Sequence, residues 1–154
     1  MSAGKSIVEV EKEIIDEFSF FDSWDEKYEY IIELGKKLPS LDPAFRQDVY
    51  KVKGCQSTVW LGSKYKEGKV FFEADSDSVI VKGLISLLIR VLSTHSTEDI
   101  IAAPLDFIDR IGMSSHLAQT RANGLLAMVK QMKQDAMAYK LKFEMDTANS
   151  ENPA

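Results

Sequence analysis

The sequence predicts a single domain in which helices flank a group of short β-strands. Apolar residues recur at helical spacing near the N-terminus and again from residue 79 onward, whereas residues 49–74 alternate with a period of two. The 154 residues are a usual length for one domain and can bury a core without metal or disulfide support. We therefore expect helices and a sheet to share one core.

Two helices are predicted before the strands. The first carries an apolar stripe at Ile7, Val10, Ile14, Phe18 and Phe21. The second starts after Ser23, whose spacing to Glu26 is that of a capping box, and ends at Pro39. Residues 40–46 are expected to form a connecting loop.

Three short strands are expected at 49–53, 58–65 and 69–74, because these segments are rich in Val, Phe, Tyr and Trp and alternate in polarity. Residues 66–68 include a glycine that suits a tight hairpin turn. The second and third strands should therefore be antiparallel neighbours.

Helices are predicted for the rest of the chain. Residues 75–78 offer side-chain oxygens to cap a buried helix at 79–92, in which Gly83 indicates the close approach of another backbone. Short helices are expected at 97–102 and 105–111, followed by a last helix that is capped by Thr120 and ends near Leu141. We expect the domain to span 1–143 and the polar tail, 144–154, to be frayed.

Composition excludes several classes of function. A net charge of −5 disfavours nucleic acid and anionic membranes as main partners, because both require a basic surface. The longest apolar stretch is interrupted by Lys82 and Arg90 and is too short to span a membrane. One cysteine permits no internal disulfide, and the first six residues do not resemble a signal peptide, so we expect a cytoplasmic location.

Cys55 is the first candidate for chemistry, because it lies in the tight connection between two expected strands. Gly54 permits a sharp turn, and Gln56 and Ser57 suit an exposed loop. Nearby Lys51 and Lys53 would either favour the thiolate by their charge or simply point to solvent. A lone cysteine is also commonly an inert small hydrophobe, and the residues themselves leave both interpretations open.

Other chemistries have weaker support. A cysteine hydrolase needs a histidine beside the thiol; His95 and His116 are distant in sequence, and His95 suits the C-terminal end of a helix. Asp75 and Asp77 lack the further spaced ligands of a metal site, so helix capping is the better explanation. Glycine motifs that bind phosphate are absent from the sequence.

Several motifs together resemble one known family. The most specific is Gly-Cys-Gln-Ser-x-Val-Trp at 54–60, combined with Asp-Ser-Asp at 75–77 and Val-Lys-Gly-Leu at 81–84. Further matches are 24–28, 31–35, His116, Leu117, Arg121, Gly124 and Leu125. The chain resembles the SufE family, including its CsdE relatives, which accept sulfur from cysteine desulfurases in iron-sulfur cluster assembly.

The resemblance implies an α+β fold with a three-stranded antiparallel sheet packed against helices, similar to the IscU-type scaffold proteins. It also implies that Cys55 lies at a loop tip. The segments expected from the residues are compatible with this fold. The chain departs from the family in its longer N-terminal lead, at 41–48, at 100–115 and in the tail. These departures affect the expected identity of the partner more than the expected chemistry.

The resemblance further implies that Cys55 takes sulfur from the persulfide of a pyridoxal-phosphate cysteine desulfurase, stimulates that enzyme and delivers sulfur to an iron-sulfur scaffold. The chain would then be a persulfide carrier and activator rather than a stand-alone enzyme, with no cofactor of its own and no nucleic acid or membrane partner. Two alternatives stay open. The chain could be a regulatory partner in which Cys55 is incidental, or a cysteine-dependent hydrolase or peroxidase.

Roles for the remaining site residues are hypotheses built on this resemblance. Gly54, Gln56 and Ser57 would let the loop swing Cys55 into a partner's active site. Asp75 and Asp77 would tune loop release or the partner surface in addition to capping the helix. Arg121 would tie the last helix to the loop region through a carboxylate or a backbone carbonyl.

Overall fold

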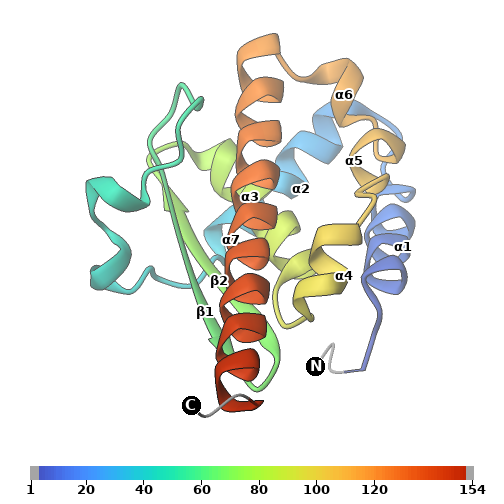
Figure 1. The fold of residues 1–154 in the computed structure, drawn as a ribbon. Helices are drawn as coiled ribbons and strands as arrows, with labels where there is room; N and C mark the ends of the chain where they lie inside the picture. Colours follow the sequence, from blue (N-terminus) through green and yellow to red (C-terminus); the bar gives the residue numbers. More distant parts are fainter. Residues whose placement is uncertain (1–3, 152–154) are drawn as a thin grey trace.

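A two-stranded antiparallel sheet with helices packed against one of its faces forms the domain (Figure 1). The computed structural model describes the backbone of residues 4–151 and the side chains of all of these except 114 and 147–151. Strands β1 (Val59–Lys66) and β2 (Lys69–Ser76) pair from Val59↔Ser76 to Lys66↔Lys69. Their turn uses Glu67 and Gly68 at φ 53° and 79°, as tight hairpins require, so the predicted hairpin is confirmed.

The strand predicted at 49–53 is wrong. This segment contains a 3₁₀ turn, η2 (Asp48–Tyr50), and pairs with β1 only through an isolated bridge between Lys51 and Trp60. The alternation of polar and apolar residues in this segment does not correspond to alternating burial, because the apolar residue Val49 is 79% exposed.

The physical reason lies in how the preceding turn, η1 (Pro43–Phe45), packs. Phe45 covers the outer face of β1 at Gly62, where a Cβ would lie only 2.2 Å from the Phe45 ring. The chain therefore crosses the face of the sheet and reaches its edge only at Val52, whose N–H donates to the Val59 carbonyl at 2.9 Å.

The N-terminal helices begin at serine caps. Helix α1 (Ile7–Phe18) starts after Ser6, which forms a capping box with Glu9. Helix α2 (Trp24–Lys36) starts after Ser23, whose hydroxyl accepts the Glu26 N–H at 3.2 Å. The predicted box at α2 is only half formed, because the Glu26 carboxylate accepts from Asp22 N–H instead. Helix α1 ends before Phe21, so the first predicted helix was too long.

Helix α3 (Val79–Leu92) is the centre of the core and has the bounds predicted for it. It crosses α2 where two glycines meet. A Cβ on Gly83 would lie 2.1 Å from the Ile31 carbonyl oxygen, and one on Gly35 would lie 2.6 Å from the Gly83 nitrogen. The close backbone approach predicted from Gly83 is confirmed.

The C-terminal half consists of α4 (Thr97–Ala102), α5 (Phe107–Arg110), α6 (Met113–His116) and α7 (Gln119–Glu151). Helix α4 matches its prediction, and α6 was not predicted. Helix α7 starts before Thr120, which is therefore not its cap, and continues past Leu141 to Glu151. The predicted fraying of 144–154 stays a prediction, and 152–154 lie outside the described residues.

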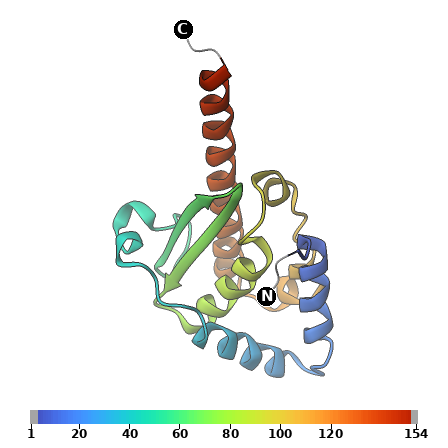
Figure 2. The ribbon, with the colours of Figure 1, turned by 90° about the horizontal axis from the view of Figure 1, so that it is seen from below.

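Helices α3 and α7 cover the inner face of the sheet. Side chains of both helices meet those of the strands there: Val59, Leu61, Ala74, Ile85, Leu88, Met128 and Met132. Figure 2 shows the far end of α7 projecting beyond the other elements. None of the helices described is long and apolar enough to cross a membrane. This layering places the loop before β1 beside the first turns of α7.

The Gly83→Ala variant tests the glycine crossing. Its methyl group would overlap backbone of α2, which cannot move aside as a flexible side chain can, so we expect unfolding free energy to fall by about 1–3 kcal/mol. Urea unfolding followed by circular dichroism measures this loss. Val79→Ala is the control, because Val79 is exposed on the same helix and its truncation should change stability by less than about 0.5 kcal/mol. Equal stability of the two variants would contradict the crossing.

Candidate functional site

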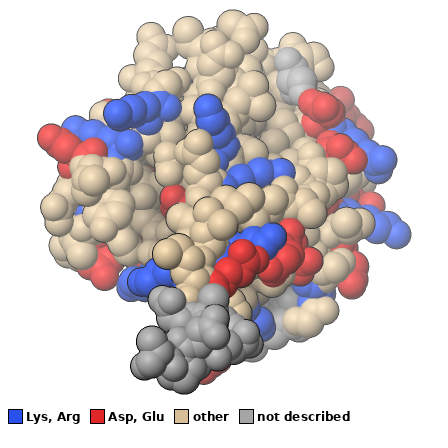
Figure 3. All heavy atoms as spheres, viewed as in Figure 1, with Lys and Arg blue, Asp and Glu red and all other residues tan. Residues whose placement is uncertain are grey.

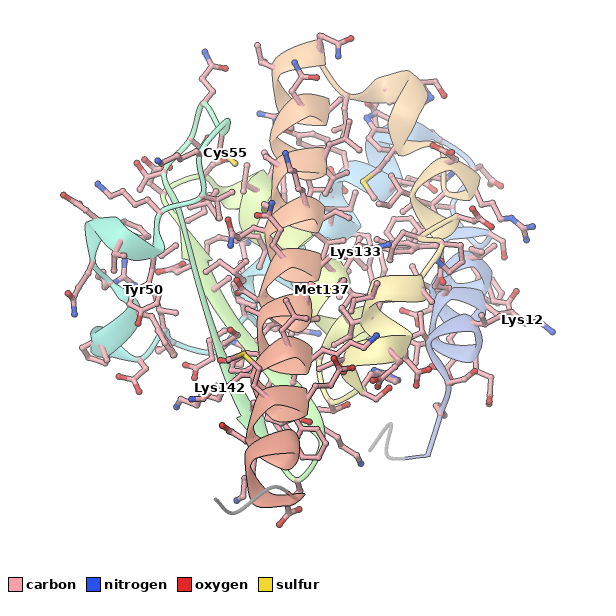
Figure 4. All side chains as sticks on the ribbon, viewed as in Figure 1. Lys12, Tyr50, Cys55, Lys133, Met137 and Lys142 are labelled. Atoms are coloured by element: carbon pink, nitrogen blue, oxygen red, sulfur yellow. The ribbon has the colours of Figure 1, made fainter. Side chains whose placement is uncertain are left out.

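Cys55 lies in the loop 53–57, beside the first turns of α7 (Figure 4). Gly54 has φ +92°, a left-handed conformation that favours glycine, and it turns the chain toward the helix. The Cys55 thiol donates a long hydrogen bond of 3.6 Å to the Gly124 carbonyl oxygen of α7. The thiol is therefore half-buried against a helix rather than free at a loop tip.

A pocket of about 110 Å³ adjoins this thiol. Its apolar wall consists of Val59, Val81, Leu84, Leu125 and Met128, and its polar side chains are those of Gln56, Ser57, Thr120 and Arg121. The sheet, α3, α7 and the loop each contribute to it. Of the predicted loop residues, Gln56 and Ser57 thus line the pocket together with Cys55.

Burial raises the pKa of the Cys55 thiol above its ordinary value. The expected activation by lysines is not seen. The Lys51 ammonium pairs with Asp48 at 3.1 Å and lies 5.9 Å from the centre of the Trp60 ring, and the Lys53 side chain is exposed. Desolvation therefore determines the direction of the shift, and the resting thiol is held in its neutral form at neutral pH.

Asp77 holds the end of the Cys55 loop. Its carboxylate accepts the Thr58 N–H at 3.1 Å, and its own N–H donates to the Thr58 carbonyl at 3.3 Å. The capping role predicted for Asp75 and Asp77 is wrong, because the cap of α3 is Ser78, which accepts the Val81 N–H at 3.5 Å. The physical reason is that the Asp77 carboxylate is engaged by the Thr58 N–H, while Ser78, one residue nearer the helix, occupies the cap position.

Asp75 serves a neighbouring ion cluster. It binds the Arg46 guanidinium at 2.5 Å and lies 3.6 Å from the Lys82 ammonium. Burial pushes its pKa upward, but hydrogen bonds from Arg46 and the Ser76 N–H, with the charge of Lys82, outweigh burial and lower the pKa. Arg46 also lies 4.7 Å from the centre of the Trp60 ring. Asp75 thus fastens the segment before the Cys55 loop to the sheet.

Arg121 is brought to the pocket by the first turns of α7. The tie that we predicted from its guanidinium to the loop is not formed: within the described part of the chain, Arg121 makes no hydrogen bond or ion pair. Its charge therefore stays available beside the thiol.

Neither histidine lines the pocket. The ring nitrogens of His95 lie 3.0 Å from the Ser93 and Lys5 carbonyl oxygens, and His116 stacks on Trp24 at 4.6 Å between ring centres. A hydrolase mechanism needs a base within hydrogen-bond reach of the nucleophile. Among the residues that the structure describes, the lining of the Cys55 pocket includes no histidine or carboxylate that could act as this base.

Sequence reasoning missed two residues of the site. Gly124 accepts the thiol hydrogen bond and lets the loop approach, with a hypothetical Cβ 3.6 Å from the sulfur. A glycine inside an otherwise helical pattern was the available signal. No sequence pattern marked Arg46 as a site residue, because its partner Asp75 lies in a distant segment of the chain.

Acidic and basic side chains are interspersed over the face that α7 crosses (Figure 3). Within the residues that the structure describes, no group of three or more histidine, cysteine or acidic side chains is arranged to hold a metal ion. The site is thus a single half-buried thiol beside a pocket with one apolar and one polar wall, in a small domain of helices and one hairpin.

Comparison with known proteins identifies the family. The family model named "SufE", described as an Fe-S metabolism associated domain, matches residues 12–136. The chain belongs to the SufE family, and this membership suggests a role in iron-sulfur metabolism.

Relatives agree with this assignment. Uncharacterised SufE-like proteins of Rhizobium meliloti and Rhizobium etli are 38% and 40% identical over 129 residues, covering 80% of this chain and 92% and 87% of theirs. The Arabidopsis thaliana SufE-like protein 1, chloroplastic/mitochondrial, is 37% identical over 142 residues, covering 92% of this chain but 38% of its own length.

A solved structure shows the same fold. The solution structure of a hypothetical protein from Thermus thermophilus has a TM-score of 0.71 and 20% identity, covering 84% of this chain and 94% of that chain. The α+β class is thus supported, with two strands in place of the three expected.

The pH dependence of alkylation tests the thiol environment. Because burial raises the pKa of Cys55, fewer molecules carry the thiolate at neutral pH, and iodoacetamide should react more slowly than with free cysteine. The reaction rate should rise with pH, with a midpoint above the value of about 8.5 for free cysteine. The same protein unfolded in urea is the control and should return to the ordinary midpoint. A folded midpoint below about 8.5 would contradict the burial effect.

Replacing Asp77 tests the anchor of the loop. Asp77→Ala removes the acceptor for Thr58 N–H, and the loss of about 1 kcal/mol of hydrogen bonding should accelerate Cys55 alkylation by roughly fivefold. Asp77→Asn is the matched control, since its amide oxygen can still accept. If Ala and Asn variants react at the same rate, the hydrogen bond does not restrain the loop.

Proposed function

We propose that this protein accepts sulfur from the persulfide of a pyridoxal-phosphate cysteine desulfurase onto Cys55, stimulates that enzyme and passes the sulfur to an iron-sulfur scaffold. The observation that carries the proposal is a lone thiol with a partly apolar pocket beside it. Family membership supports the link with iron-sulfur metabolism.

The transfer is a thiol exchange with balanced atoms and electrons. The Cys55 thiolate attacks the terminal sulfur of the donor persulfide, a new S–S bond forms on Cys55, and the donor S–S bond breaks. The donor cysteine leaves as a thiolate and takes up a proton equivalent to the one that Cys55 lost. No oxidant, reductant or metal is consumed, so one cysteine suffices as the reacting group in this chain.

The pocket suits the product of this exchange. Its volume of about 110 Å³ leaves space for a further sulfur atom beside Cys55. Val81, Leu84 and Leu125 would exclude water and dissolved thiols from the bound sulfur, and the charge of Arg121 would favour a persulfide anion.

Reaction requires the loop to leave this resting position. The raised pKa suppresses the thiolate while Cys55 faces Gly124, and solvation outside the pocket would restore its ordinary acidity. The 3.6 Å thiol contact is longer than a strong hydrogen bond and opposes release only weakly. Gly54, Gln56 and Ser57 would thus carry Cys55 into the partner's active site.

The proposal is tested by incubating the protein with a purified cysteine desulfurase and cysteine, followed by mass spectrometry of the Cys55 peptide. We expect one added sulfur atom on wild-type protein and none on Cys55→Ser. Lys53→Gln is the control variant, because it changes an exposed side chain of the same loop outside the pocket and leaves the thiol intact. Fold stability of Cys55→Ser should stay within about 1 kcal/mol of wild type.

The same experiment separates the alternatives. Desulfurase stimulation that survives in Cys55→Ser would show a regulatory partner in which the cysteine is incidental. Turnover of an ester or peroxide without any partner would favour a cysteine-dependent hydrolase or peroxidase, against the absence of histidine from the pocket lining. Either result would overturn sulfur acceptance as the main role.

A further inference from the structure

A second, more polar cavity lies between η2, β1 and α7, apart from the pocket at Cys55. Its volume is about 270 Å³, just under the range of about 300–1,000 Å³ that is usual for small-molecule pockets. Its lining includes Tyr50 from η2, Ser63 from β1, and Gln131, Asp135 and Tyr139 from α7. Three elements therefore direct polar groups into one space.

Asp135 is the charged group at the centre of this arrangement. Its carboxylate accepts from the Ser63 hydroxyl at 3.1 Å and from the Gln131 amide at 2.9 Å, both of which are neutral donors. Burial raises the pKa of Asp135 despite these two hydrogen bonds. The carboxylate is thus partly removed from water, and its two neutral hydrogen-bond donors do not fully offset the lost hydration.

No cation within the described chain compensates this carboxylate by a salt bridge. Lys51 is the basic residue that lines the cavity, but its ammonium is engaged by Asp48 at 3.1 Å. Asp135 is half-buried, so its carboxylate bears part of the cost of desolvation without a cationic partner, and a bound cation would offset that part.

The geometry points to this cavity as a binding site for a small organic ammonium ion, held by the Asp135 carboxylate. An ammonium group donates up to three hydrogen bonds, and the carboxylate and hydroxyl oxygens of Asp135, Ser63 and Tyr139 are acceptors on the wall. Tyr50 and Tyr139 add aromatic side chains for contact with the organic part of the ion; the Tyr139 ring also stacks on Tyr65, and the Tyr50 ring packs on Phe45. A metal ion is a poorer fit, because calcium and magnesium prefer several carboxylate or carbonyl ligands and Asp135 is the single acidic residue in the lining.

Asp135 could instead serve only to hold β1 and α7 together, and this structural role predicts a different result. The bonds that join Ser63 to Asp135 and Tyr139 also fasten β1 to α7, with the Tyr139 hydroxyl donating to the Ser63 carbonyl at 2.9 Å. That network needs an acceptor at position 135 but no negative charge. Asp135→Asn separates the two roles. It removes the charge, its amide oxygen can still accept from Gln131, and its amide N–H can donate to the Ser63 hydroxyl, which is able to accept as well as donate.

The test is a titration of the isotopically labelled full chain with ethanolammonium, followed by two-dimensional NMR. We expect saturable shifts of amide signals around Ser63 and Asp135. Ethylene glycol is the matched neutral probe and should cause none, which tests the site in the wild-type protein independently of any variant. Asp135→Asn should weaken ethanolammonium binding by at least tenfold, about 1.4 kcal/mol.

Glu144→Gln is the control variant, because it removes one negative charge from an exposed position of α7 outside the cavity. It should bind like wild type. Three results would overturn the proposal: absence of saturable shifts, equal binding to Asp135→Asn, or equal shifts with magnesium chloride, which would indicate a non-selective cation effect. None of them bears on sulfur acceptance at Cys55.

Discussion

The contact between the Cys55 loop and the first turns of α7 is the constraint on which the site depends. A half-buried thiol can rest there because Gly54 turns the loop inward and Gly124 leaves the helix surface bare where the sulfur arrives. Helix α7 is in turn held over the sheet by Met128 and Met132, which pack against strand and α3 side chains. The packing of the core thus fixes the environment of the one thiol in the chain.

Protection and reactivity place opposite demands on such a thiol. A neutral, desolvated sulfur is a poor nucleophile, whereas a fully exposed thiolate is open to any oxidant. Here the loop is anchored at both ends, by Val52 on Val59 and by Asp77 on Thr58, while the sulfur itself is held by one long hydrogen bond. The arrangement confines any release to the few residues around Cys55 and leaves the fold undisturbed.

Local patterns predicted much of this structure. The hairpin follows from alternating strands around a glycine turn, and α3 follows from an apolar segment after a serine cap, because both depend on neighbouring residues. Gly83 signalled a helix crossing, since a glycine inside a helix is costly without close packing. The prediction of a third strand was wrong for the opposite reason. The path of residues 43–52 depends on the packing of Phe45 over Gly62, and no local sequence pattern indicates this contact between distant segments.

By itself, the sequence determined the α+β class, the family, and the single thiol in a glycine-bounded turn, because these rest on local periodicity and on an uninterrupted motif. Only the tertiary structure decided what surrounds that thiol. Gly124 as its acceptor, Asp77 as the anchor of its loop and Arg46 as the partner of Asp75 all join segments distant in sequence. Such pairings follow from how α7 and the outer segment pack on the sheet, and burial created by that packing, rather than nearby lysine charge, sets the direction of the thiol pKa.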